Sequence, residues 1–234
     1  MALAQPCDDP AFCPEMIDQV DLVRFGQEGE RIAEAAWSAL EHVAIDSEPL
    51  RVNIAELMAR RGEVFSALNS LSAAMLNTVK FRFHGDFHLG QVLIVQQDVC
   101  IVDYEGEPLH GASARFAKDT PLRDVAGMLR SIDYAAAAAV QAIEQRLLTD
   151  PQRAERMSNT GADFVSAAFL EAYDLKIAGS PAEVQDRDAR KKIVSLKFLI
   201  KALYEIRYEA EFRPAWIGLP VRGVLNLLDH MSNK

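Results

Sequence analysis

The chain lacks three features that would assign it to well-defined protein classes. It has only three cysteines in 234 residues, at positions 7, 13 and 100, and their spacing argues against both a disulfide framework and a zinc knuckle. No apolar run approaches the roughly 18 residues that a membrane span requires. Residues 1–14 also lack the basic start and apolar middle of a signal peptide. The sequence therefore predicts a cytoplasmic protein with reduced thiols and no membrane contact.

Positive charge is also scarce. Lysine and arginine number 25 against 34 aspartates and glutamates, which gives a formal net charge of −9. Nucleic-acid backbones are bound by clusters of basic side chains, and the one basic cluster, residues 187–192, is better explained as the solvated start of a long helix. We therefore expect no nucleic-acid partner.

The pattern that is present is mainly helical. Half of the residues are apolar, which is enough for a sizeable core. Apolar residues recur at helical spacing, and Thr120 with Pro121 is a typical helix start. The expected helical regions are 15–42, 53–78, 121–148, 153–173, 181–210 and 219–230, with a break near 46–49 and an interruption at Gly62. Residues 1–14 hold three prolines and are predicted to be an irregular leader.

Two short β-branched segments interrupt the helical pattern. Residues 92–95 and 99–102 are predicted to pair as a hairpin, with residues 96–98 as the tight connection. A hairpin brings the residues before its first strand next to those after its second. The predicted fold class is thus mainly α with a small β-hairpin.

Polar side chains gather at the open end of this hairpin. The predicted pairing would make Asp86 and Gln91 face Asp103. Carboxylate and amide oxygens form the kind of site that holds Mg²⁺ against phosphate. Phosphoryl transfer also needs a carboxylate that accepts the proton of the attacking hydroxyl, and Asp86 is a candidate for it.

Four segments of the sequence carry a family resemblance. HGDFHLGQ resembles the catalytic loop of the aminoglycoside-phosphotransferase-like kinases, in which an Asp is followed five positions later by a metal-binding Asn or Gln, as Asp86 is by Gln91. VDYEGEP is similar to the metal-binding segment after the hairpin in that fold. Together with PLRDVAGMLRSIDYAA and KALYEIRYEAEFRPAWIGLP, these segments resemble the maltokinases.

The resemblance implies the C-terminal helical lobe of a protein-kinase-like fold and ATP-dependent phosphorylation of maltose, or a similar glucoside, to maltose 1-phosphate. It implies that Asp86 is the catalytic base, and that Gln91 and Asp103 hold Mg²⁺ on the phosphates of ATP. Glu105 would add a second carboxylate to the metal site or reach the sugar.

The same resemblance implies supporting and sugar-binding roles. Asp124 would be the acceptor that fixes the backbone of the catalytic loop, and His84 and His88 would also anchor that loop. Carbohydrate recognition needs aromatic faces and planar polar groups. The residues predicted for the sugar side are Glu107, Tyr204, Glu205, Tyr208, Glu209, Arg213 and Trp216. A tyrosine pair at helical spacing also fits ordinary packing, and for Glu107 the surface is an equal alternative.

The sequence departs from this family in one respect. Such kinases carry a strand-rich N-terminal lobe with a glycine-rich loop and a lysine that hold ATP, and neither GxGxxG nor GxxxxGK[ST] occurs in this chain. We predict a leader over 1–14 and a kinase-like C-terminal lobe over 15–234. The N-terminal lobe would be absent or come from another chain, such as one with the trehalose synthase domain to which maltokinases are often fused. Kinase activity of the chain alone is then expected to be weak or absent.

Two other functions remain open at the level of sequence. The chain could be a non-catalytic lobe that binds a maltose-like sugar or a partner protein, which an exposed apolar face would favour. It could also be a metallohydrolase, with His84, Asp86 and His88 as ligands and His110 as the nearest further histidine. Zinc retained through purification would favour the hydrolase.

Overall fold

The computed structural model describes residues 8–45, 47–104, 106, 117–147 and 151–232. The chain forms two compact units, one of Met1–Glu15 with Val79–Glu183 and one of Met16–Thr78 with Val184–Lys234. Most of the described chain is helical, and two small two-stranded sheets complete it. The prediction of a mainly α chain with a small hairpin is therefore confirmed. The division into a leader and a single lobe stays a prediction.

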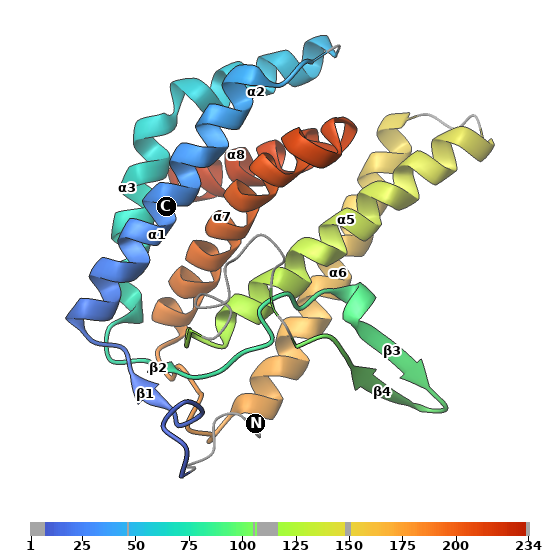
Figure 1. Ribbon diagram of the computed structural model, residues 1–234. Coiled ribbons are helices and arrows are strands. Elements are labelled where there is room, and N and C mark those ends of the chain that lie inside the picture. Colours follow the sequence, from blue (N-terminus) through green and yellow to red (C-terminus); the bar gives the residue numbers. More distant parts are fainter. Residues whose placement is uncertain (1–7, 46, 105, 107–116, 148–150, 233–234) are drawn as a thin grey trace. The chain divides into compact units, whose positions relative to one another are not determined.

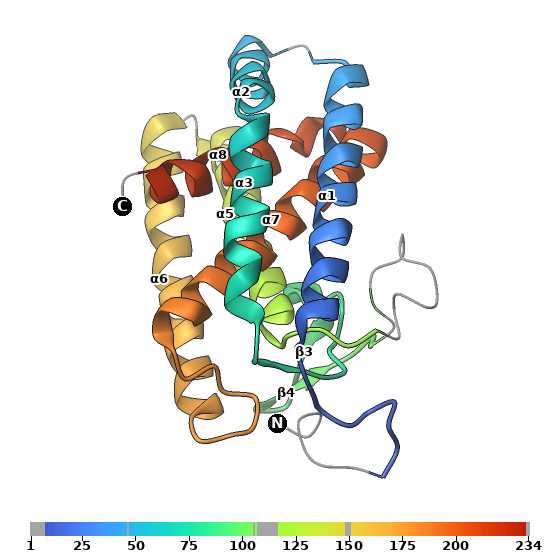
Figure 2. The ribbon, with the colours of Figure 1, turned by 90° about the vertical axis from the view of Figure 1, so that its left-hand side faces the viewer.

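The second unit is built around one long helix. Helices α1 and α3 both pack against α7, and α8 packs against α7 and α2 (Figures 1 and 2). Its elements are α1 (Gln19–His42), α2 (Glu48–Ala59), α3 (Arg61–Ser72), the 3₁₀ turn η2 (Ala73–Met75), α7 (Arg187–Phe212), the 3₁₀ turn η4 (Pro214–Trp216) and α8 (Gly218–Ser232). Large apolar side chains from these helices are fully buried, among them Trp37, Leu57, Leu68, Leu199 and Leu203. Their burial is the main stabilisation of this unit.

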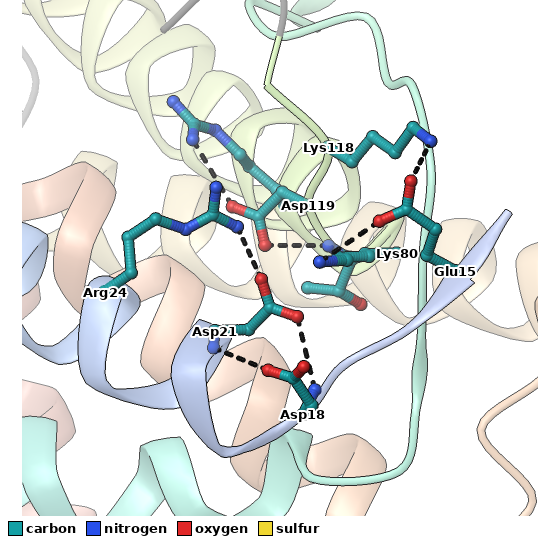
Figure 3. A network of polar contacts seen from close by, with 9 residues as sticks. Glu15, Asp18, Asp21, Arg24, Lys80, Lys118 and Asp119 are labelled. Atoms are coloured by element: carbon teal, nitrogen blue, oxygen red, sulfur yellow. Dashed lines mark hydrogen bonds and ion pairs between the residues drawn. The ribbon is translucent and has the colours of Figure 1, made fainter. Parts of the chain in front are cut away.

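Two helices begin later than the apolar periodicity of the sequence predicts, because capping side chains fix their first residues. The helix expected from residue 15 begins at Gln19, because Asp18 and Asp21 form a reciprocal capping box in which each carboxylate accepts the other's backbone N–H. Figure 3 shows this box together with Arg24, whose Nη2 lies 2.8 Å from Asp21 Oδ1. The helix expected from residue 181 begins at Arg187, because the Asp186 carboxylate accepts the N–H groups of the first turn.

The helical region expected over 53–78 is also different in the structure. Helix α2 already begins at Glu48, with Pro49 in its first turn, where a missing N–H does no harm. It ends at Ala59, and α3 begins at Arg61, so the interruption lies just before Gly62. Thr78 lies beyond the end of the helical segment at Met75.

The first unit carries the hairpin and two long helices. Its helices α5 and α6 lie side by side (Figures 1 and 2), and strands β3 and β4 form the hairpin. The bounds are η3 (Leu89–Gln91), β3 (Val92–Val95), β4 (Asp98–Ile101), α5 (Leu122–Leu147) and α6 (Pro151–Ile177). A second small sheet pairs β1 (Glu15–Met16) with β2 (Val79–Lys80). A backbone bridge between Phe81 and Asp119 ties the segment before the HGDFHLGQ loop to the segment before α5.

A lysine holds the N-terminal segment of the first unit. Lys118 Nζ donates to the carbonyl oxygens of Pro10 at 2.6 Å and Cys13 at 2.7 Å, and it pairs with Glu15 (Figure 3). Glu15 also pairs with Lys80 at 3.3 Å. The hydrogen bond from Lys118 lowers the pKa of Glu15, with partial burial acting in the opposite direction. Segment 8–15 is thus fixed by polar contacts although it has little regular structure.

Among the helices of the described ranges, none is both long and apolar enough to cross a membrane. The cytoplasmic location stays a prediction.

Candidate functional site

The hairpin forms close to where the sequence predicts it. Val92 pairs with Ile101 and Val95 pairs with Asp98 in antiparallel register. The second strand therefore begins at Asp98, one residue earlier than expected, and the connection has only two residues. Gln96 takes a positive φ of 58°, which is the backbone twist that a two-residue hairpin turn requires.

The open end of the hairpin brings two predicted metal ligands together. The N–H of Val102 donates to the carbonyl oxygen of Gln91 at 3.0 Å, which extends the pairing past β3 and β4. The Gln91 side chain donates from Nε2 to Asp103 Oδ2 at 2.9 Å. Asp103 has a φ of 64°, in the left-handed region that Asp and Asn tolerate better than most residues. Two hard-oxygen side chains therefore meet at this point, as the sequence predicts.

His84 links the HGDFHLGQ loop to the same end of the hairpin. The side chain is buried, and its Nε2 lies 2.8 Å from the carbonyl oxygen of Val102. Its Nδ1 accepts a long hydrogen bond of 3.4 Å from the N–H of Asp86. Because a carbonyl only accepts and an N–H only donates, these partners assign the donating role to Nε2 and the accepting role to Nδ1. The His84 ring thereby connects the backbone of Asp86 to that of Val102, the residue before Asp103.

Asp86 lies on the loop between His84 and His88. The Asp86 carboxylate is partly exposed, and its Oδ2 is 3.7 Å from His88 Nε2. His88 in turn caps η3, because its Nδ1 accepts the N–H of Gly90 at 3.1 Å. The arrangement leaves the Asp86 carboxylate accessible on a loop whose neighbours are held by hydrogen bonds.

Asp124, in the first turn of α5, contacts the loop backbone directly. Its Oδ2 accepts the N–H of His84 at 2.8 Å, and its Oδ1 accepts the N–H of Gly85 at 3.0 Å. This is the geometry that the predicted anchoring role requires. Burial raises the pKa of Asp124, and the two N–H donors act against that rise. Gly85 has a φ of 90° and approaches Gly106 closely, so a side chain would be strained here.

The raised pKa of Asp124 predicts a pH-dependent difference between the wild type and Asp124→Asn. A carboxyl with a higher pKa in the folded state than in the unfolded state binds its proton first in the folded state. Its contribution therefore favours folding increasingly as the pH falls from the folded-state pKa to the unfolded-state pKa. The free energy of unfolding of the wild type relative to Asp124→Asn should therefore rise as the pH is lowered from 7 towards 4. Urea unfolding of both proteins across that range measures it. A relative stability that falls on acidification would mean that the hydrogen bonds outweigh burial.

Two further α5 residues that sequence reasoning missed also contact this loop. The N–H of Leu89 donates to Ser131 Oγ at 3.0 Å. At Gly127 a Cβ atom would lie only 2.7 Å from the carbonyl oxygen of Phe87. The available signal is spacing, since Asp124, Gly127 and Ser131 recur on one face of a helix.

The residues predicted for the sugar side belong to the other unit, on α7 and η4. Tyr204 and Tyr208 stack with their ring centroids 6.5 Å apart, and the Arg213 guanidinium lies 5.2 Å from the Tyr208 ring. Glu205 and Glu209 are buried, with 8% and 0% of their surfaces exposed. Arg213 Nη2 is 2.6 Å from Glu209 Oε1, and Trp216 in η4 is half-buried. The predicted sugar-side residues of α7 and η4 therefore lie close to one another. The rings of Tyr204 and Tyr208 already contact each other, and the Tyr208 ring also contacts Arg213.

Three residues named from the sequence, Glu105, Glu107 and His110, lie outside the described residues.

The metallohydrolase alternative loses support from the residues that are described. His84 uses both ring nitrogens within the protein, as above. Within the described ranges, no group of three or more His, Cys, Asp or Glu side chains is placed to hold a metal ion.

Comparison with known proteins identifies glucosamine kinases among the relatives of this chain. No protein-family model matches the sequence. The glucosamine kinase of Streptacidiphilus jiangxiensis is 28% identical over 203 residues, which cover 83% of this chain and 42% of that protein. The glucosamine kinase of Mycolicibacterium smegmatis (strain ATCC 700084 / mc(2)155) is 30% identical over 175 residues, 74% of this chain and 40% of that protein. The chain thus spans about two fifths of the length of these relatives.

Solved structures give the same result for the fold. Glucosamine kinase in complex with glucosamine, ADP and inorganic phosphate matches with a TM-score of 0.72 at 23% identity, over 92% of this chain and 47% of that one. Crystal form A of glucosamine kinase matches with a TM-score of 0.72 at 22% identity, over 94% of this chain and 49% of that one.

These relatives are glucosamine kinases, so the comparisons support the kinase-like part of the sequence prediction but not its assignment to the maltokinases. The chain has a sugar-kinase-like fold over about half the length of the solved structures that it matches.

Proposed function

We propose that this chain is the catalytic lobe of an ATP-dependent sugar kinase that acts on glucosamine or a similar amino sugar. The observation that carries the proposal is the meeting of Gln91 and Asp103 at 2.9 Å, at the end of a loop on which Asp86 is accessible. The names of the relatives support ATP as the donor and a sugar as the acceptor.

In the proposed reaction Asp86 is the general base. A sugar hydroxyl attacks the γ-phosphorus of ATP, a new O–P bond forms, and the bond between that phosphorus and the oxygen of the ADP leaving group breaks. The Asp86 carboxylate accepts the hydroxyl proton. Positioning and charge stabilisation carry most of the catalysis in such transfers. The hydrogen bonds that hold the loop at His84, Gly85 and Leu89 therefore bear on the rate.

The side chains at the hairpin end also fit a magnesium ion. Gln91 and Asp103 offer amide and carboxylate oxygens, which are the ligands that Mg²⁺ prefers, and Glu105 is proposed as a third. When bound there, the ion would neutralise charge on the phosphates of ATP. The hydrogen bond from Gln91 Nε2 to Asp103 Oδ2 keeps these two side chains next to each other.

An amino sugar fits the α7 residues better than maltose does. The ammonium group of glucosamine is a cation, whereas maltose carries no charge. Glu205 on α7 is a largely buried carboxylate, and such a carboxylate is well suited to pair with an ammonium, whereas Glu209 one turn later already pairs with Arg213. We propose Tyr204, Tyr208, Arg213 and Trp216 as the remaining sugar contacts, with Glu107 as the proposed contact outside the described residues.

Glu205→Gln tests this substrate preference. Removing the charge should lower kcat/KM for glucosamine by about 100-fold, because a buried charge pair loses one partner, and should change kcat/KM for glucose by less than about 3-fold. Initial rates of sugar phosphate formation with each sugar measure both effects. Glu211→Gln, an exposed glutamate on the same helix, is the matched control and should leave both rates unchanged.

Different results would favour different functions. Equal losses for glucosamine and glucose would remove Glu205 from amine recognition. Preference for maltose would favour the maltokinase alternative, which rests on the four sequence segments. Sugar binding without turnover of ATP would favour the non-catalytic lobe. A partner that supplies an N-terminal lobe stays a prediction, and the names of the relatives give no support to a trehalose synthase partner.

A further inference from the structure

We infer that Gly127 and Ser131 are positioning residues, which set the Asp86 and Gln91 ends of the loop against one face of α5. The inference rests on the proposed kinase function for its consequence, but its geometric content stands on contacts within the first unit. Three positions on successive turns of α5 contact residues 84–89. Asp124 contacts the start of this segment, Gly127 its middle and Ser131 its end.

At Gly127 the important property is the missing side chain. A Cβ atom there would lie 2.7 Å from the carbonyl oxygen of Phe87, which is a backbone atom and cannot rotate away. The loop would have to retreat by roughly 0.5 Å to restore van der Waals distance. Phe87 directly follows Asp86, so this retreat would move the proposed base.

Ser131 acts on the other end of the segment. Its Oγ accepts the N–H of Leu89 at 3.0 Å, and Leu89 is the first residue of η3. The backbone of η3 then leads to Gln91, whose N–H donates to the carbonyl oxygen of His88 at 2.9 Å. Loss of the serine hydroxyl would release the start of this turn and with it the orientation of Gln91.

Together these contacts fix the backbone on both sides of Asp86, at residues 84–85 and at Leu89. The N–H groups of His84 and Gly85 are bonded to Asp124 and that of Leu89 to Ser131, while the carbonyl of Phe87 lies against Gly127. A displacement of about 1 Å at a reacting group can cost about 100-fold in rate. The spacing between the base and the metal ligand is therefore fixed by α5 and not by the loop alone.

The test compares Gly127→Ala and Ser131→Ala with the wild-type chain in two measurements. Steady-state kinetics should show kcat about 10-fold lower for Gly127→Ala, because the expected retreat is about half of the displacement that costs about 100-fold. KM for ATP and for glucosamine should change by less than about 3-fold. Amide hydrogen exchange should be about 10-fold or more faster for residues 84–89 in Gly127→Ala, and for Leu89 alone in Ser131→Ala. Ser131→Thr keeps the accepting hydroxyl and should restore slow exchange at Leu89.

Gly161→Ala in α6 is the control for glycine replacement within a helix, since a Cβ atom there meets nothing within 4 Å. It should change neither kcat nor the exchange of residues 84–89. Wild-type exchange in Gly127→Ala would overturn the inference, as would a wild-type kcat in that variant. The exchange measurement needs no turnover, so it decides whether α5 positions the loop even where the chain alone forms little sugar phosphate. Failure of the wild-type chain to bind glucosamine would count against the proposed function and not against this positioning.

Discussion

Replacing Asp86 by asparagine should lower the rate of sugar phosphorylation by about 10²- to 10⁴-fold and leave the binding of Mg²⁺·ADP unchanged. Asparagine has nearly the same size but cannot accept the hydroxyl proton, and general-base catalysis contributes a factor of this order. The backbone of the loop should stay in place, because its hydrogen bonds to Asp124 and Ser131 come from main-chain N–H groups.

Two measurements separate this chemical role from a structural one. Sugar phosphate formation reports turnover, and calorimetric titration with Mg²⁺·ADP reports the integrity of the nucleotide side. Asp98→Asn removes an exposed carboxylate at the turn end of the hairpin, opposite the open end that carries the proposed site, and should behave as wild type. Turnover by Asp86→Asn equal to that of the wild type would exclude Asp86 as the base.

Replacing Asp103 by asparagine should lower kcat by about 10³-fold and weaken the Mg²⁺-dependent binding of ADP. The loss corresponds to the several kcal/mol of charge stabilisation that a metal supplies in such transfers. Folding should be retained, because asparagine tolerates the positive φ of 64° at this position and can still accept the hydrogen bond from Gln91.

Asp103→Ala provides the comparison for this variant. It removes the same carboxylate but places alanine in the left-handed region, which costs about 1 to 2 kcal/mol. Both variants should therefore bind ADP weakly in the presence of Mg²⁺, and only Asp103→Ala should unfold at a lower urea concentration. Unchanged Mg²⁺ dependence of ADP binding in Asp103→Asn would contradict the proposed metal site.

The hairpin is a feature that local sequence patterns predict well. Two short runs of β-branched and apolar residues placed both strands to within one residue, because strand formation and a tight turn depend on neighbours in sequence. The same reasoning placed Gln91 next to Asp103, since pairing in a hairpin fixes which residues meet. The helix starts at Gln19 and Arg187 were missed because side-chain caps at Asp18 and Asp186 set them, and apolar periodicity does not register a cap.

Local sequence patterns were enough to predict the mainly helical class, the hairpin and the meeting of Gln91 with Asp103. These features depend on short spacings and on residue types with few alternative uses. The contacts of Gly127 and Ser131 with the HGDFHLGQ loop, and the burial of Glu205 and Glu209, became visible only in the packed structure. The spacing of Gly127 and Ser131 places them on the helix face of Asp124 but does not say which segment approaches that face. The partner of Ser131 lies some 40 residues away in sequence and meets it only when α5 packs against the loop.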